Sequence, residues 1–388
     1  MKHFSFFLSF FSIMLFAQQK IKIVDSETQS ALPDARIIAN NQIYYTNDDG
    51  FCLVPDNAIM DISAGGFQSL KAVKVQAVIQ LKPLYNAMDE VKIVSIDPTL
   101  VLKKVLKTFD KVYYTKPITY NINVNQKVYE NNDLMLLMIA DGKFWSRDGK
   151  FNPKEAFKKN FNNFVQIQVD NLPYLKSKEI LGKVKVKDKD AGPDDVGDFF
   201  LNFELNRTLS FMQTRSLTTS GRIIFEDEEV QEIAFNMKSD KYSLYFKGKF
   251  LYNKADNAIT HFELDFKQSD SKPRKLKDED GKDYESQLGD GLIYFDYYKK
   301  DQYYYPARLG VKSEKFKKVL SSGTYEYRTA REFIFKSIAD YDSKGLPRPV
   351  SLGNYFWKDL KVSTDKGDVL LSKEEEAFIN EATSNKKD

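Results

Sequence analysis

The sequence predicts a mainly β protein with a small N-terminal β-sandwich, a linker helix, and a larger β-rich domain built on a curved antiparallel sheet with a few helices. Three observations support this prediction. The 388 residues include 22 Tyr, 30 Phe and 2 Trp, and aromatic residues are enriched in strands. Short runs of alternating apolar and polar residues are separated by turn residues along most of the chain. The length favours two domains over one core.

The composition excludes several classes of function. The 58 Lys and Arg residues nearly balance the 55 Asp and Glu residues. The chain therefore lacks the large excess of positive charge that indicates binding to a nucleic acid. One Cys and two His exclude an internal disulfide and the multi-cysteine and three-histidine zinc sites. The sequence has no GxSxG, P-loop or GxGxxG motif. These absences favour a protein without a cofactor and leave enzymatic activity unassigned.

Residues 1–17 have the organisation of a secretory signal peptide. Met1–His3 is a short basic start, Phe4–Phe16 is an apolar stretch without charge, and Ala17 is a small residue at the cleavage position. The stretch is shorter than the roughly 20 apolar residues that cross a bilayer, and a retained membrane anchor is the alternative. We expect an exported protein, periplasmic or associated with the outer membrane, with no transmembrane helix after the signal is removed.

Residues 18–95 are predicted to form the small sandwich. Short apolar strands alternate there with turn residues, and their close spacing is typical of an all-β sandwich. Asn47–Gly50 is the clearest turn, because Asn and Asp side chains bond their own backbone and Gly accepts a positive φ. An alternative reading of this segment as a calcium loop lacks the necessary spacing of oxygen ligands.

The ordered motifs of this segment carry a family resemblance. They are Ile23-Val24-Asp25, Leu32-Pro33-Asp34-Ala35, Thr46–Gly50, Ser63–Phe67, Ile79-Gln80-Leu81 and Asp89–Val94. This series resembles the carboxypeptidase regulatory-like domain, a transthyretin-like sandwich common at the start of exported Bacteroidetes proteins. Lys22 and Cys52 stand where that family usually has Gly and Phe. The resemblance implies an accessory domain with no catalytic residues and no peptidase activity of its own.

A linker helix is predicted within residues 96–117. Asp97 suits the N-cap and Pro98 suits the first turn. Val101, Val105 and Phe109 recur at helical spacing and form an apolar stripe. The lysines on the opposite face are interpreted as a solvated surface, and binding to an anionic surface is the alternative.

Residues 118–345 are predicted as the β-rich domain, and residues 346–388 as a tail with a short helix that begins after a capping box. Two of the predicted strands in the domain, joined by a turn at Lys254–Asn257, place their aromatic side chains on one face. The candidate ligand-binding residues on this face are Tyr242, Phe246, Phe250, Phe262 and Phe266, with Leu244, Tyr252 and Leu264 beside them.

The residue pattern of this hairpin is similar to that of lipoprotein-carrier proteins, which fold as an open half-barrel. This resemblance implies an apolar ligand on the concave face. The alternative is a face filled as ordinary core by a helix predicted from Lys154 to Phe164. We favour the filled core, because apolar strand faces are usually buried.

Two groups of residues are candidate metal ligands. Asp188, Asp190 and Asp194 lie in an acidic loop that could collect calcium. His261 and Glu263 lie on the polar face of one predicted strand, where they could bind a metal weakly or relay a proton. A flexible loop and a solvated strand face are the respective alternatives, and we favour both.

The sequence thus predicts an exported, non-catalytic cell-envelope protein whose β-rich domain binds an unknown envelope protein or an apolar ligand. One alternative is a hydrolase that uses carboxylates alone, with the sandwich as its accessory domain. The other is an outer-membrane β-barrel, in which charged side chains would face the lumen.

Overall fold

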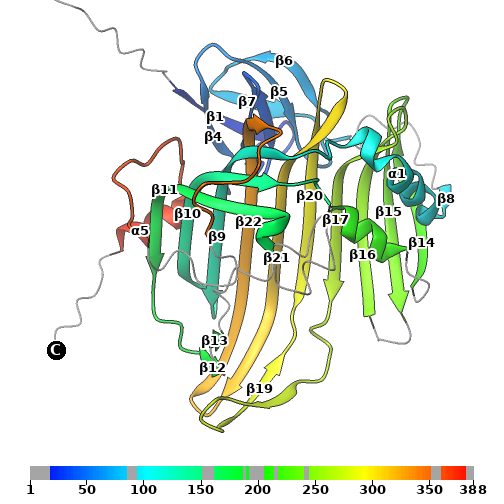
Figure 1. The fold of residues 1–388 in the computed structure, drawn as a ribbon. Helices are drawn as coiled ribbons and strands as arrows, with labels where there is room; N and C mark the ends of the chain where they lie inside the picture. The colour runs from blue at the N-terminus through cyan, green and yellow to red at the C-terminus, as the bar shows by residue number, and fades with distance from the viewer. Residues whose placement is uncertain are drawn as a thin grey trace, which may run out of the picture. The chain divides into compact units, whose positions relative to one another are not determined.

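The computed structural model describes residues 18–84, 94–150, 161–186, 189–191, 205–213, 217–239, 244–350 and 360–381. The predicted signal peptide lies outside the described residues. The chain divides into two compact units, residues 1–87 and 88–388. The predicted fold class is confirmed: the fold is mainly β, with a small N-terminal sheet region and a larger sheet domain after it (Figure 1). Within the described ranges, no helix has the length and apolarity needed to cross a membrane.

The first unit is a sandwich of two sheets. Its strands are β1 (Gln18–Asp25), β2 (Arg36–Ala39), β3 (Gln42–Tyr45), β4 (Phe51–Pro55), β5 (Ile59–Ser63), β6 (Leu70–Lys74) and β7 (Val78–Leu81). One sheet has the order β4-β1-β7 and the other β3-β2-β5-β6. Side chains from both sheets meet in one core, which includes Ile23, Ile37, Val54, Met60 and Leu81. The alternation of apolar and polar residues thus buries one face of each sheet.

The predicted turn at Asn47–Gly50 is present in this unit. The Asn47 Oδ1 atom accepts hydrogen bonds from the backbone amides of Asp49, at 3.1 Å, and Phe51, at 2.9 Å. Gly50 has a φ of +78°, and a Cβ atom there would lie 2.9 Å from the carbonyl oxygen of Ile23. Glycine is therefore required both by the backbone conformation and by the close approach of β1.

The second unit is organised around one large sheet in which every neighbouring pair of strands is antiparallel. Its main order is β11-β10-β9-β22-β21-β20-β17-β16-β15-β14-β8, and β18 and β19 extend it beside β21. The strands are β8 (Val94–Ile96), β9 (Ile118–Glu130), β10 (Asp133–Ser146), β11 (Val165–Ser177), β14 (Thr218–Glu226), β15 (Val230–Ser239), β16 (Leu244–Asn253), β17 (Ala258–Lys267), β18 (Arg274–Lys277), β19 (Asp283–Gln287), β20 (Asp290–Lys300), β21 (Tyr303–Leu320) and β22 (Gly323–Tyr341). A separate two-stranded sheet pairs β12 (Val184–Val186) with β13 (Lys189–Ala191).

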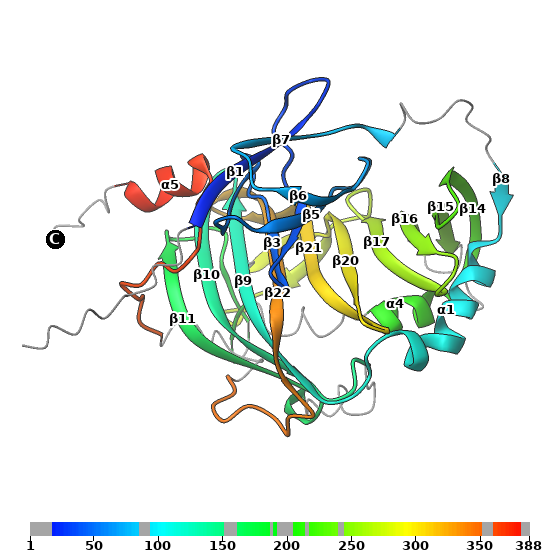
Figure 2. The same ribbon diagram turned by 90° about the horizontal axis from the view of Figure 1, so that it is seen from above.

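The large sheet is curved, and two helices lie on its concave side near β14 to β17 (Figure 2). They are α1 (Pro98–Val112) and α4 (Leu205–Met212). The apolar stripe of α1 is buried in the sheet's core, as at Leu102 and Val105, whereas Lys103, Lys104 and Lys107 are exposed. The helix predicted as a linker therefore belongs to the second unit, where β8 precedes it and pairs with β14.

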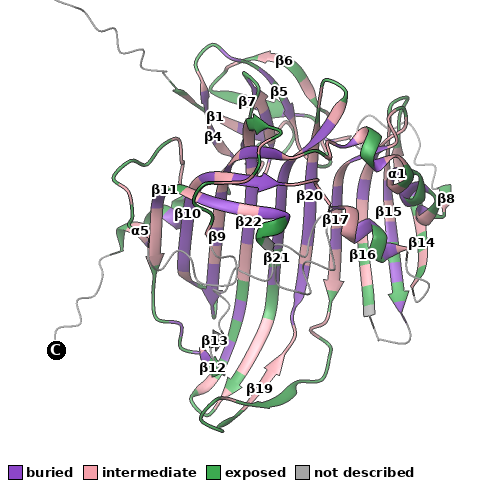
Figure 3. Ribbon diagram, in the orientation of Figure 1, coloured by how far each residue is buried: buried purple, intermediate pink, exposed green. Residues whose placement is uncertain are grey.

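Burial is uneven along the sheet. Buried residues concentrate in the middle of the long strands, whereas β18, β19 and the adjoining ends of β21 and β22 are largely exposed or intermediate (Figure 3). On the convex face, α5 (Lys373–Asn380) covers part of β9 and β10 (Figure 2). Its capping box between Ser372 and Glu375 is present as predicted, and the Glu375 carboxylate lies 2.8 Å from the Lys127 ammonium. The tail is thereby anchored to the second unit.

Candidate functional site

The strand face predicted to bind a ligand is closely packed core at its centre. Phe250 and Phe262 have no exposed surface. The Phe262 ring centroid lies 6.3 Å from that of Phe250, 5.8 Å from that of Phe235 and 6.1 Å from that of Phe295. Tyr252 and Leu264 are also buried. The centre of this face is therefore buried core, while its filling by the helix predicted at 154–164 stays a prediction, and we call these four phenylalanines the phenylalanine cluster.

Two described helices, α4 and α1, pack against this core. Phe211 of α4 packs edge-on against Phe246, with ring centroids 5.8 Å apart, and α1 contacts β14 and β17. Phe246 and Phe266 are half-buried at the border of the core. Tyr242 lies outside the described residues, as does most of the helix predicted at 154–164. The described part of that segment is a 3-10 turn at residues 161–163, followed by the buried Phe164.

His261 is engaged with two carboxylates. Its Nδ1 atom lies 2.6 Å from Oδ1 of Asp296, and its Nε2 atom lies 2.8 Å from Oε1 of Glu263. Burial lowers the pKa of His261, but the two carboxylates outweigh burial and raise it to about 9. The ring is therefore a protonated cation at neutral pH, whereas a metal requires the neutral imidazole. In the described structure both ring nitrogens of His261 thus face carboxylates, and the metal site at His261 and Glu263 stays a prediction.

The other predicted metal ligands are only partly described. Asp188 and Asp194 lie outside the described residues, and the backbone of Asp190 lies in β13, opposite Lys185. Across the described ranges, no group of three or more His, Cys, Asp or Glu side chains is arranged to hold a metal ion. Both readings of the acidic loop, calcium binding and the flexible loop that the sequence favours, stay predictions.

The ion pairs of His261 continue across the convex face of the sheet. The Arg308 Nε atom donates to Oδ2 of Asp296 at 3.0 Å, and Arg308 Nη1 lies 3.2 Å from Oε1 of Glu332. The Tyr294 hydroxyl donates to the same Glu332 oxygen at 2.8 Å. Because these carboxylates already hold cations, they are poorly suited to the general acid and base of a carboxylate hydrolase.

A small cavity lies farther along the concave face, between the end of α1 and strands β9, β10 and β20 to β22. Its volume is about 60 Å³, and we call it the tyrosine cavity. None of its lining side chains is charged, which favours a neutral occupant. The lining residues are Phe109, Tyr113, Tyr114, Ile118, Tyr120, Phe144, Ser146, Gly149, Tyr297, Tyr304, Pro306, Leu309 and Phe335.

Tyr113 fixes the wall of the cavity beside α1. Its ring stacks on Phe109 at a centroid distance of 4.3 Å. Its hydroxyl donates to the carbonyl oxygen of Ile259 at 2.9 Å and accepts from the Ile259 amide at 2.7 Å. Burial raises the pKa of Tyr113 well above its usual value of 10, so the hydroxyl stays neutral. It anchors the end of α1 to β17.

Tyr120 lines the same cavity but has a different hydrogen-bonding state. Only 3% of its surface is exposed, and its ring packs edge-on against Phe335 with centroids 5.1 Å apart. Burial, followed by the neighbouring tyrosines, raises the pKa of Tyr120 well above 10. Among the described residues, its neutral hydroxyl has no hydrogen-bond partner. The hydroxyl is not one of the fully buried, unpartnered polar atoms of the described residues, so it is accessible from the cavity and can donate to an occupant.

No family model matches the chain, and no curated protein matches it either. The resemblance of the first unit to the carboxypeptidase regulatory-like domain therefore stays a prediction from its motifs.

The sequence pattern alone does not indicate the tyrosine cavity, although it contains one signal of it. Five tyrosines occur between residues 297 and 305, around the turn between β20 and β21. Tyr113 and Tyr114 add two more after α1. Such a density of hydroxyl-bearing rings indicates an aromatic surface with polar groups, but only the fold brings these segments together with Tyr120.

Proposed function

We propose that this chain is an exported, non-catalytic protein of the cell envelope whose second unit binds a neutral, largely apolar ligand in the tyrosine cavity. The observation that carries the proposal is the Tyr120 hydroxyl, which forms no hydrogen bond among the described residues and borders a cavity without charged walls. A ligand oxygen that accepts from Tyr120 would satisfy this donor, and the aromatic walls would cover the ligand's apolar surface.

The volume of the tyrosine cavity limits the size of the ligand that can enter it. A cavity of about 60 Å³ is smaller than the roughly 300–1,000 Å³ of sites that enclose a whole drug-sized ligand. We therefore propose that one end of a ligand enters, such as a ring or the end of a chain. Tyr114 and Tyr297 are half-buried wall residues, and their side chains are the ones that would move to admit more of it.

Export is proposed from the signal peptide of residues 1–17, and an accessory role of the first unit from its family resemblance. The absence of catalysis is supported by the lack of a nucleophile motif in the sequence and by the ion pairs that engage Glu263, Asp296 and Glu332.

The test is a titration of the mature full chain with N-phenyl-1-naphthylamine, a neutral fluorescent probe. We expect saturable fluorescence, because one ring of the probe can enter the cavity. Leu309→Trp places a larger side chain in the cavity wall and should remove most of the signal. Leu276→Trp is the matched control, because Leu276 is 40% exposed on β18.

Two results would contradict the proposal. One is the absence of saturable binding by the parent chain. The other is equal binding by Leu309→Trp and Leu276→Trp, which would place the probe elsewhere on the surface. Thermal melting of both variants checks that each is folded under the conditions of the titration.

A further inference from the structure

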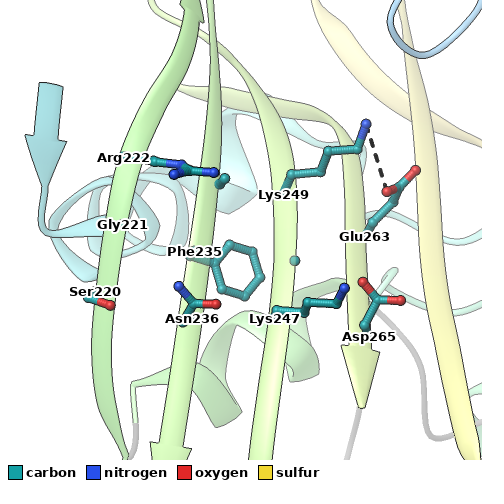
Figure 4. A pocket seen from close by; sticks show the side chains of 11 residues that line it. Ser220, Gly221, Arg222, Phe235, Asn236, Lys247, Lys249, Glu263 and Asp265 are labelled. Carbon is teal, nitrogen blue, oxygen red and sulfur yellow. Dashed lines mark ion pairs between the residues drawn. The ribbon is translucent and has the colours of Figure 1, made fainter. Parts of the chain in front are cut away.

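A second hollow lies on the convex face of the sheet, over strands β14 to β17 (Figure 4). Its volume is about 500 Å³, within the range of roughly 300–1,000 Å³ found for small-molecule sites. We call it the charged trough. The polar and charged side chains that line it are Ser220, Arg222, Asn236, Lys247, Lys249, Glu263 and Asp265.

The register of the strands explains the hollow. Arg222, Ala234 and Lys249 are cross-strand neighbours in one row. Neighbouring strands are about 4.8 Å apart, so the two long cations stand on either side of the small Ala234 side chain. The next row places Ser220 beside Asn236. The floor between β14 and β16 is thus built from small and polar side chains.

The cations of the trough differ in their partners. The Lys249 ammonium lies 3.2 Å from the Glu232 carboxylate and 3.9 Å from that of Glu263. Lys247 extends from β16 toward Asp265 of β17 (Figure 4). Arg222 instead extends from β14 across β15 (Figure 4), and within the described part of the chain it forms no ion pair. Within the described ranges Lys247 forms no ion pair either, but it lies beside Asp265, whereas Arg222 is separated from β17 by two strands and is the cation farther from the trough's carboxylates.

Neutral donors stand beside Arg222. The Asn236 Oδ1 atom accepts a hydrogen bond from the Tyr245 hydroxyl at 2.9 Å, which orients the amide and leaves its NH₂ group to donate. The exposed Ser220 hydroxyl lies next to it. A guanidinium with such donors suits the oxygens of a phosphate or carboxylate.

The opposite wall of the trough has the complementary chemistry. Burial raises the pKa of Asp265 and outweighs the neighbouring lysines, which lower it. Glu263, paired with His261, lies beside it on the same strand face. Carboxylate oxygens accept hydrogen bonds from ligand hydroxyls and repel an anion, so an anionic group belongs at the Arg222 end.

We propose that the charged trough binds a small hydroxylated anion, with its phosphate or carboxylate group at Arg222 and its hydroxyl groups toward Glu263 and Asp265. This site lies on the sheet face opposite the tyrosine cavity and does not depend on the function proposed there.

The test is isothermal titration of the full mature chain with glucose 6-phosphate, glucuronate, glucose and inorganic phosphate at low ionic strength. We expect saturable binding of at least one hydroxylated anion, more tightly than either glucose or phosphate alone. Arg222→Ala should weaken it about tenfold or more, because a charge-assisted pair is lost. Ala234→Leu should block the hollow without changing the charge.

Arg274→Ala is the matched control, because Arg274 is an exposed strand arginine on β18, outside the trough. It should bind like the parent. Failure of the parent to bind either hydroxylated anion would overturn the proposal. So would equal weakening by Arg222→Ala and Arg274→Ala, or unchanged binding by a folded Ala234→Leu variant.

Discussion

The concave face of the large sheet has two ends with the same backbone architecture and different side chains. At the β15 to β20 end, Phe235, Phe250, Phe262 and Phe295 fill the space between strands with stacked and tilted rings. At the end bordered by β9, β10 and β20 to β22, the rings surround the tyrosine cavity. One face of one sheet is thus closed at the first end and hollow at the second.

The difference lies in the hydroxyl groups. A phenylalanine ring has no polar atom, so it can pack against apolar neighbours in any favourable orientation. A buried tyrosine must also place its hydroxyl against a partner. Tyr113 finds its partner in the Ile259 backbone, whereas Tyr120 has none among the described residues. We infer that the phenylalanine cluster stabilises the fold and the tyrosine cavity serves binding.

The largest expected effect comes from truncating the phenylalanine cluster. Phe250→Ala and Phe262→Ala should each lower the free energy of unfolding by about 3–5 kcal/mol, because a fully buried ring is replaced by a cavity. Denaturant titration measures this loss, and Phe211→Ala, at a ring that is 40% exposed, should lose less. Losses near zero at both buried positions would show that this end is not the core.

The next effect is a pH dependence at His261. Its pKa is about 9 in the folded protein and about 6.5 in an unfolded chain. The folded state therefore binds this proton more tightly, so the stabilisation is complete below pH 6.5. It should fall as the pH rises to about 9, by up to roughly 3 kcal/mol.

His261→Gln removes this titration and serves as the control. Denaturant titrations at several pH values between 6 and 9 should show the loss in the parent and a much flatter profile in the variant. Parallel profiles would mean that another group causes the change and that His261 is not held as a cation.

A smaller effect on the free energy of unfolding should distinguish Tyr113 from Tyr120. Tyr113→Phe should lower the free energy of unfolding by about 1–3 kcal/mol, because the buried Ile259 amide and carbonyl both lose a partner. Tyr120→Phe should leave stability unchanged or slightly higher, since it removes an unpaired hydroxyl. Thermal and denaturant melting of the two variants measures the contrast. Equal losses would show that the Tyr120 hydroxyl is already satisfied in the unliganded protein.

The smallest effect is on ligand preference. The parent should bind 1-methoxynaphthalene more tightly than naphthalene, because only the ether oxygen can accept from Tyr120. Tyr120→Phe should remove this preference, which corresponds to roughly 0.5–1.5 kcal/mol for one neutral hydrogen bond. Competition with the fluorescent probe measures both affinities. A preference that survives in Tyr120→Phe would assign the contact to another group.

Local patterns in the sequence predict the parts of the structure that depend on residues close together in the sequence. The stripe Val101, Val105, Phe109 predicted α1, and Ser372 with Glu375 predicted the start of α5. The alternation around Phe250 and Phe262 correctly placed both rings on one face of a hairpin. Each of these signals is contained within one or two turns of helix or one pair of strands.

The candidate site depends on pairings between distant segments, which the sequence pattern does not show. β9 pairs with β22, and this brings Tyr120 to Phe335 across more than half of the chain. The sequence does not show that His261 is engaged, because its partner Asp296 lies on β20 and not on its own strand. Most of the helix expected at 154–164 lies outside the described residues, and the described helices near β14 to β17 are α1 and α4, which the sequence pattern does not assign to this face.

Xenon binding tests the contrast between the two ends most directly, because xenon enters small apolar cavities and can be located in crystals by its anomalous scattering. The measurement is a crystal structure of the full mature chain under xenon pressure. We expect a xenon atom in the tyrosine cavity, bordered by Tyr120, Leu309 and Phe335, and none within the phenylalanine cluster. An empty tyrosine cavity, or a xenon atom among Phe235, Phe250, Phe262 and Phe295, would contradict the account.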